Sequence, residues 1–105
     1  MNRVEELLLI LSEECAEVSQ AAIKCIRFGM DSAHLVRTNR ECLETELGDM
    51  LAMFKLLVEE ASIREEVVME AAEAKLIKVE KFMRNPRVKL PSLPTYKPRK
   101  NKPKS

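Results

Sequence analysis

Residues 11–29 of the chain read LSEECAEVSQAAIKCIRFG, and their apolar side chains recur at the spacing of an amphipathic helix. The pattern reaches back to the start of the chain and stops at Gly29, a residue type that often ends helices. We therefore expect a first helix over about residues 2–28. Its apolar positions are Val4, Leu7, Leu8, Leu11, Cys15, Val18, Ala21, Ala22, Cys25 and Ile26.

A second stretch, LETELGDMLAMFKLLVEE over residues 43–60, has the same helical spacing. Thr38 and Glu41 precede it at the spacing of a capping box, in which each side chain bonds the backbone N–H of the other residue. They predict a second helix over about residues 39–61. A loop with room for a short helical turn joins it to the first helix.

Ser62 and Glu65 repeat the capping-box spacing and predict a third helix over about residues 63–83. Asn85-Pro86 stops it, because the residue before proline disfavours the helical conformation. No strand of substance is visible. The chain is therefore expected to be all-α, with three main helices that form a four-helix-bundle-type core by oligomerisation.

The two ends of the chain differ in charge. Residues 1–83 hold all 17 acidic residues and ten basic ones, for a net charge of −7, whereas residues 84–105 hold eight basic residues and no acid. Five prolines also lie in this last stretch, at positions 86, 91, 94, 98 and 103. We expect a helical domain over residues 1–84 and an extended, partly disordered basic tail over residues 85–105.

The three cysteines are expected to be small buried thiols in a reducing cytosol, because Cys15 and Cys25 are ten residues apart on one helix and no CxxC pair exists. The third cysteine is Cys42. No apolar stretch approaches the roughly 20 residues of a membrane span. These features predict a cytoplasmic protein without a membrane partner.

Four acidic residues lie on helix faces that otherwise carry apolar side chains. Charged residues ordinarily face water on an amphipathic helix. Glu14 and Glu17 are three residues apart, and Glu46 and Asp49 repeat this spacing on the second helix. Residues at that spacing point the same way, so antiparallel packing of the two helices would bring all four acids together.

Such a cluster needs compensation, because ionised carboxylates a few ångströms apart repel one another. Protonation, Lys or Arg partners, or a divalent cation would each supply it, and the cation does so most economically. Ligand sets made of oxygen favour Mg²⁺, Mn²⁺ or Ca²⁺ over zinc. Helical di-iron sites use ExxH pairs, whereas the single histidine, His34, lies in the loop outside such a frame.

The string Glu13-Glu14-Cys15-Ala16-Glu17, separated by 28 residues from Glu46-Leu47-Gly48-Asp49, resembles the EExxE and ExxD motifs of the MazG-like all-α nucleoside triphosphate pyrophosphohydrolases. The likeness covers about residues 4–83. It implies an Mg²⁺-dependent enzyme, in which Mn²⁺ can substitute, that cleaves a (d)NTP to the (d)NMP and pyrophosphate. Its implied metal ligands are Glu14, Glu17, Glu46 and Asp49, and Glu13 is implied as a fifth catalytic residue that binds metal or positions the attacking water.

Basic residues are expected to hold the phosphates and the leaving pyrophosphate. Lys24 lies seven residues beyond Glu17 on the same face, and Arg27 closes the first helix. Lys75 and Lys78 are the candidates on the third helix. The later signature of the family is incomplete here, because Val79 stands where relatives often carry Asn.

The likeness further implies self-association into a homodimer or homotetramer and a role in nucleotide-pool control or house-cleaning, in the cytoplasm of a bacterium or of a phage host. A phosphoribosyl-ATP pyrophosphohydrolase is a near relative with the same fold. A different hypothesis is a non-catalytic helical interaction module whose tail contacts nucleic acid. Residues 97–104 contain five basic residues, but only Tyr96 adds an aromatic ring, so we expect such contact to be weak.

Overall fold

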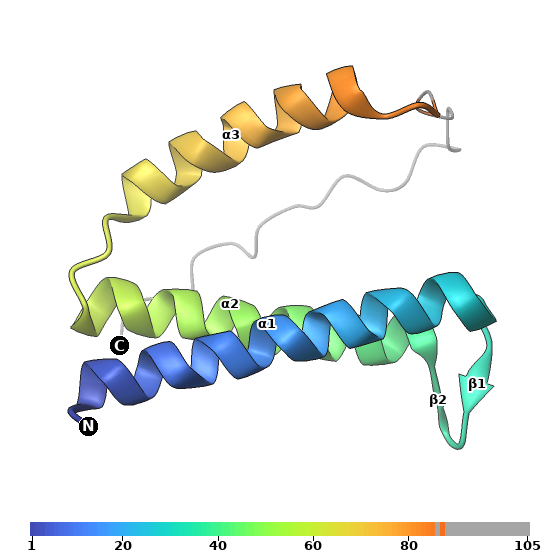
Figure 1. Cartoon of the computed structure of the whole chain (residues 1–105), viewed down its shortest axis with the longest axis horizontal. Helices are drawn as coiled ribbons and strands as arrows, with labels where there is room; N and C mark the ends of the chain where they lie inside the picture. The colour runs from blue at the N-terminus through green and yellow to red at the C-terminus, as the bar shows by residue number, and fades with distance from the viewer. Residues whose placement is uncertain (86, 88–105) are drawn as a thin grey trace, which may run out of the picture. The chain divides into compact units, whose positions relative to one another are not determined.

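Three helices make up most of the part of the chain that the structure describes (Figure 1). The structure is a computed structural model and describes residues 1–85 and 87. The helices are Arg3–Phe28 (α1), Asn39–Glu60 (α2) and Glu65–Phe82 (α3), which confirms the all-α prediction. Among the described residues, no helix combines the length and the apolarity needed to cross a membrane.

Both ends of α1 are fixed by local hydrogen bonds. At the start, the Asn2 side chain accepts from the Glu5 backbone N–H at 2.9 Å, and Glu5 Oε1 accepts from the Asn2 N–H at 3.1 Å. At the end, the Gly29 N–H donates to the Cys25 carbonyl at 3.0 Å. Gly29 has a φ of 93°, which a residue without Cβ adopts most readily. The predicted helix end at Gly29 is thus confirmed.

A short hairpin, and no helical turn, joins α1 to α2. Strands Ala33–His34 (β1) and Arg37–Thr38 (β2) pair antiparallel, with Ala33 opposite Thr38. Leu35 in the connecting turn has a φ of 64°. The hairpin reverses the chain, so that α2 runs back along α1.

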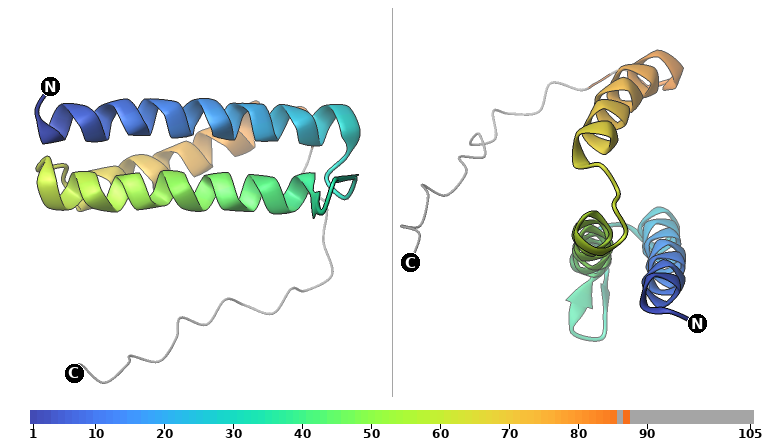
Figure 2. Two further views of the ribbon diagram at one scale, coloured as in Figure 1. Left: turned by 90° about the horizontal axis from the view of Figure 1, so that it is seen from below. Right: turned by 90° about the vertical axis from the view of Figure 1, so that its left-hand side faces the viewer.

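Helix α2 begins at the predicted capping box. The Thr38 hydroxyl accepts from the Glu41 N–H at 3.1 Å, and Glu41 Oε1 accepts from the Thr38 N–H at 3.0 Å. Figures 1 and 2 show α1 and α2 side by side and antiparallel over most of their lengths. At the far end of this pair, Arg3 of α1 forms an ion pair with Glu60 of α2.

The core between α1 and α2 is small and apolar. Its buried members are Leu7 from α1 and Met53 and Leu57 from α2, each about 5–6 % exposed. Partly buried Leu11, Leu56 and Ala61 pack against them. Ala21 is buried further along α1. These contacts hold the two helices in the register that sets the acidic residues of α1 facing those of α2.

Many large apolar side chains of these two helices stay exposed. Ile23 is 54 % exposed, Ile26 83 % and Leu51 52 %. The prediction that the cysteines are buried is wrong for this chain: Cys15 is exposed and Cys25 and Cys42 are half-buried, because two helices alone cannot enclose their flanks. All three are free thiols, as expected.

Helix α3 starts two residues later than predicted, at Glu65. The predicted N-cap at Ser62 is wrong, because Ser62 has a φ of 56° while an N-cap residue adopts an extended backbone. The chain divides within α3 into two compact units, with the break between Glu70 and Ala71. The expected domain boundary at residues 84 and 85 stays a prediction, and the expected tail lies outside the described residues apart from Asn85 and Arg87.

Candidate functional site

Three glutamates from two helices meet in the unit formed by residues 1–70. Glu14 and Glu17 come from α1 and Glu46 comes from α2, and one carboxylate oxygen from each lies within 4.8 Å of the other two. The i, i+3 spacing places the first pair on one face of α1, and the antiparallel course of α2 brings the third opposite them. We refer to these three residues as the acid cluster.

The acid cluster contains two buried oxygen atoms that lack partners. Glu14 Oε2 and Glu46 Oε2 are buried, and neither has a hydrogen-bond partner among the described residues. A buried acceptor without a partner costs about 1–3 kcal/mol, and more when it is charged. The ion pairs within residues 1–85 and 87 join Arg3 to Glu60, Asp31 to Arg40 and Glu80 to Arg87, so none of them compensates the cluster.

The electrostatics of Glu14 show the cost of this arrangement. Partial burial raises the pKa of its carboxyl above the usual value near 4.5, and the nearby charges of Glu17, Asp49 and Glu13 raise it further. A hydrogen bond with Glu17 adds to the rise. All of these causes act against the ionised form of Glu14, so the site holds a proton more tightly than an isolated glutamate does.

Glu46 is shifted in the same direction. A hydrogen bond with Glu17 is the main cause of its raised pKa, followed by partial burial and by the charges of Glu17, Asp49 and Glu14. A carboxyl pair shares such a bond only when one member carries a proton. Without a cation, protonation would relieve the repulsion within the cluster, and it is one of the three routes that the sequence left open.

The donor set fits a hard divalent cation. Carboxylate oxygens are the ligands that Mg²⁺, Mn²⁺ and Ca²⁺ prefer, and the acid cluster offers one from each of three side chains. The two partnerless oxygens of Glu14 and Glu46 are the atoms that such an ion would satisfy. A cation here would also offset the repulsion that raises the pKa of Glu14 and of Glu46.

The two other acids of the expected site lie at its edge. Asp49 is exposed, and its carboxylate is outside the group of three converging oxygens. Its charge nevertheless contributes to the raised pKa of both Glu14 and Glu46. Glu13 is also exposed and acts on Glu14 through its charge.

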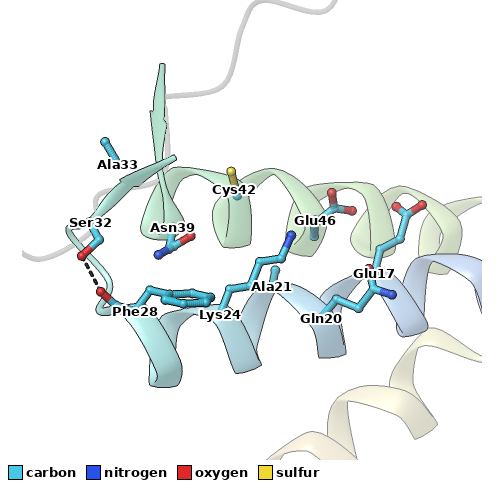
Figure 3. Close-up of a pocket in the computed structure, with 10 residues that line it drawn as sticks. All are labelled: Glu17, Gln20, Ala21, Lys24, Phe28, Ser32, Ala33, Asn39, Cys42 and Glu46. Carbon is cyan, nitrogen blue, oxygen red and sulfur yellow. Dashed lines mark hydrogen bonds between the residues drawn. The ribbon is translucent and has the colours of Figure 1, made fainter. Parts of the chain in front are cut away.

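A pocket of about 870 Å³ opens beside the acid cluster (Figure 3). Glu17 and Glu46 line one end of it, and Phe28, Ser32 and Asn39 line the other. Figure 3 shows Lys24 extending along the pocket between these ends, with its amino group turned toward α2. The remaining lining residues are Gln20, Ala21, Ala33 and Cys42.

The other predicted phosphate-binding residues are not among the residues that line this pocket. The Arg27 guanidinium lies over the Phe28 ring, 5.3 Å from its centre, and the arginine is exposed. Lys75 and Lys78 are exposed on α3, in the unit that begins at Ala71. Of the four basic candidates, the structure brings Lys24 to the pocket.

The sequence did not single out Asn39, which is the buried polar residue of the pocket. It is 5 % exposed, and its side-chain amide donates to the Gly29 carbonyl at 2.9 Å. One signal was available: Thr38 already caps α2, so Asn39 at the first helical position is not needed for capping. Asn is also a poor helix former, which suggests a role for it outside the helix.

Comparison with known proteins identifies one family. The model of the MazG nucleotide pyrophosphohydrolase domain matches residues 2–87, which is most of the chain. No curated protein and no solved structure gives a significant match.

Proposed function

This chain belongs to the MazG nucleotide pyrophosphohydrolase family, and we propose that it is an Mg²⁺-dependent enzyme that cleaves a (d)NTP to the (d)NMP and pyrophosphate. The observation that carries the proposal is the pair of buried oxygens on Glu14 and Glu46, which have no hydrogen-bond partner among the described residues. Glu46 lines a pocket that also contains Lys24. Mn²⁺ would substitute for Mg²⁺, because both prefer oxygen ligands.

The acid cluster would hold the cation through Glu14, Glu17 and Glu46, and Asp49 would complete the ligand set. A bound Mg²⁺ supplies positive charge for the phosphate oxygens and promotes ionisation of the attacking water. Glu13 lies next to the cluster and would hold that water by accepting a hydrogen bond from it. These roles need no serine or cysteine nucleophile.

Lys24 would bind the phosphates. A triphosphate carries several negative charges, and three glutamates alone would repel it. The Lys24 amino group offers three N–H donors in the pocket between the acid cluster and the Phe28 end. Arg27, Lys75 and Lys78 are further candidates to hold the leaving pyrophosphate.

Self-association accompanies this proposal. Ile23, Ile26 and Leu51 are at least half exposed, although each is apolar and lies on a helix of the α1–α2 pair. Large apolar exposure of this kind is typical of surfaces that pair with another protein. We propose that a second copy covers it, in a homodimer or homotetramer. We place the enzyme in the cytoplasm, in nucleotide-pool control or house-cleaning.

The experiment that tests the reaction is a panel of ribo- and deoxyribonucleoside triphosphates with Mg²⁺, in which pyrophosphate and phosphate are scored separately. We expect pyrophosphate and the monophosphate in equal amounts. Release of single phosphates, or no release from any substrate, would contradict the proposal. Phosphoribosyl-ATP is included in the same panel, because its cleavage would identify the related phosphoribosyl-ATP pyrophosphohydrolase reaction.

The interaction-module hypothesis predicts the opposite set of sensitive residues. If nucleic-acid binding were the function, removal of residues 97–105 would abolish it and Glu17→Gln would have no effect. The enzyme proposal predicts that the shortened chain keeps its activity and that Glu17→Gln loses it. Glu44→Gln is the matched control, because Glu44 is exposed on α2 outside the acid cluster.

A further inference from the structure

Asn39 presents a fixed hydrogen-bond acceptor to the pocket. Its Nδ2 donates to the Gly29 carbonyl at 2.9 Å, and no hydrogen bond from a described residue reaches its Oδ1. Figure 3 shows the amide nitrogen on the side of Ser32 and Phe28 and the oxygen on the side of Cys42 and Glu46, which also line the pocket. The amide cannot turn over, because that would place Oδ1 against the Gly29 carbonyl oxygen.

The backbone around Asn39 uses its own donors. The Asn39 N–H donates to the Ser32 carbonyl at 3.0 Å, and the Arg40 N–H donates to the Met30 carbonyl at 2.8 Å. The Ser32 hydroxyl donates to the Phe28 carbonyl. The start of α2 therefore has few N–H groups left for a phosphate, and the polar atom that it offers to the pocket is an acceptor.

The opposite end of the pocket has the groups that a phosphate chain needs. Glu46 lies seven residues beyond Asn39 on α2, which is about 10 Å along the helix. That separation is comparable with the span of a nucleoside from the edge of its base to its first phosphates. With Lys24 between the two ends, the phosphates belong at the acid cluster and the base belongs at Asn39.

We propose that Asn39 Oδ1 accepts a hydrogen bond from the exocyclic amino group of the substrate base, so that the enzyme selects cytosine- or adenine-bearing triphosphates over their keto counterparts. The Phe28 ring, which lines the same end of the pocket, offers an apolar face for that base. This inference rests on the function proposed above and names the substrate class of that site.

The selection follows from the fixed orientation of the amide. A keto base in the same position sets an oxygen against Oδ1, which leaves two acceptors without a donor. A buried polar group without a partner is penalised, and we expect a preference of at least about tenfold, which corresponds to about 1.4 kcal/mol. Sites built to hydrogen-bond one group of a substrate are known to reject analogues that lack it.

The experiment uses two pairs of triphosphates that differ at one position of the base. Cytosine and uracil differ as amino and keto at C4, and adenine and hypoxanthine differ in the same way at C6. Calorimetry with Mg²⁺ and the non-hydrolysable α,β-methylene deoxyribonucleotides measures binding without turnover. We expect the amino member to bind at least about tenfold more tightly in at least one pair.

Two variants separate recognition from a merely structural role. Asn39→Ala, checked for folding by circular dichroism, should bring the amino-to-keto ratio to about one by weakening the amino member. Phe28→Leu should weaken both members of a pair alike and leave the ratio unchanged. If Asn39→Ala does not fold, the ratio of the wild-type protein decides.

Three results would overturn the inference: equal or reversed affinities in both pairs, no binding of any analogue, or a ratio that a folded Asn39→Ala protein retains. The results that would refute the proposed function differ from the results that would refute the role of Asn39. Amino-selective binding without pyrophosphate release refutes the reaction and keeps the role of Asn39. Equal kcat/KM for all four hydrolysable triphosphates keeps the reaction and refutes that role.

Discussion

Glu14 of α1 and Glu46 of α2 belong to one carboxylate cluster, and each has an Oε2 atom that is buried without a hydrogen-bond partner among the described residues. The two side chains are 32 positions apart in the sequence and meet because the hairpin after Gly29 turns α2 back along α1. A fold that stabilised itself alone would gain from an apolar residue at either position. The arrangement therefore points to a ligand that satisfies both oxygens.

Addition of Mg²⁺ should stabilise the folded protein. A ligand that binds only the native state adds about 2.7 kcal/mol when its concentration is 100 times the dissociation constant. Thermal unfolding with and without Mg²⁺ measures the effect. We expect a higher Tm with Mg²⁺ for the wild-type protein and for Glu44→Gln, and no rise for Glu46→Gln. An equal rise in Tm for the wild-type protein and both variants would mean that Mg²⁺ binds outside the acid cluster.

The stability of the metal-free protein should carry a pH dependence that comes from the acid cluster. The pKa of Glu46 is raised in the folded state above its usual value near 4.5, so the native state binds a proton more tightly than the unfolded state does. The associated stability is present below that usual value and is lost as the pH rises through the folded-state pKa. Glu46→Gln removes this loss.

Urea unfolding with a chelator, at about pH 5 and about pH 8, measures the difference. The difference in the free energy of unfolding, Glu46→Gln minus wild type, should be larger at the higher pH than at the lower pH. Glu59→Gln, an exposed substitution on the same helix, should keep a constant offset. An offset for Glu46→Gln that stays constant would mean that the cluster is not strained in solution.

The periodicity of the sequence predicted the helices well because α1 and α2 pack through one apolar stripe each. It also placed Glu14 and Glu46 within those stripes, and both are half-buried. Glu17 and Asp49 are exposed, because a pair of helices encloses only the narrow line along which they touch. Periodicity gives the direction of a side chain but not the extent to which neighbouring elements cover it.

Several features depend on tertiary contacts, which helical spacing alone does not give. Asn39 is buried because the β1–β2 hairpin folds Gly29 against the start of α2, and no local pattern encodes that contact. Ser62 matched a capping box by spacing, but the turn that follows α2 gives it a positive φ. The cysteines were predicted to be buried because they belong to the apolar stripes of the two helices. The edges of those stripes are exposed to solvent in this chain.

The small core predicts a large effect from one truncation. Leu57 is 6 % exposed and packs with Leu7 and Met53. Leu57→Ala should lower the free energy of unfolding by about 3 kcal/mol, through lost transfer energy and the cavity left behind. Leu35→Ala, at a position 89 % exposed, should change it by less than about 0.5 kcal/mol. Similar effects of the two in urea unfolding would contradict the described core.

Lys24 should contribute to triphosphate binding through its charge. Hydrogen bonds to charged groups contribute about 1.5–3 kcal/mol, so Lys24→Met should reduce kcat/KM by at least about tenfold. Lys55→Met is the control, because Lys55 is exposed on α2 and absent from the lining of the large pocket. Steady-state kinetics with a fixed substrate at constant Mg²⁺ measures both. Equal kcat/KM values for Lys24→Met and Lys55→Met would show that Lys24 does not bind the triphosphate.

The most direct measurement is the rate of pyrophosphate release from a triphosphate at saturating Mg²⁺, compared between Glu46→Gln and the wild-type protein. Glu46→Gln keeps the size of the side chain and removes the charge that would hold the cation. If the acid cluster holds the ion that serves the cleavage, release should fall by at least about a hundredfold, while Glu44→Gln keeps the wild-type rate. Release by a folded Glu46→Gln protein at the wild-type rate would contradict the account.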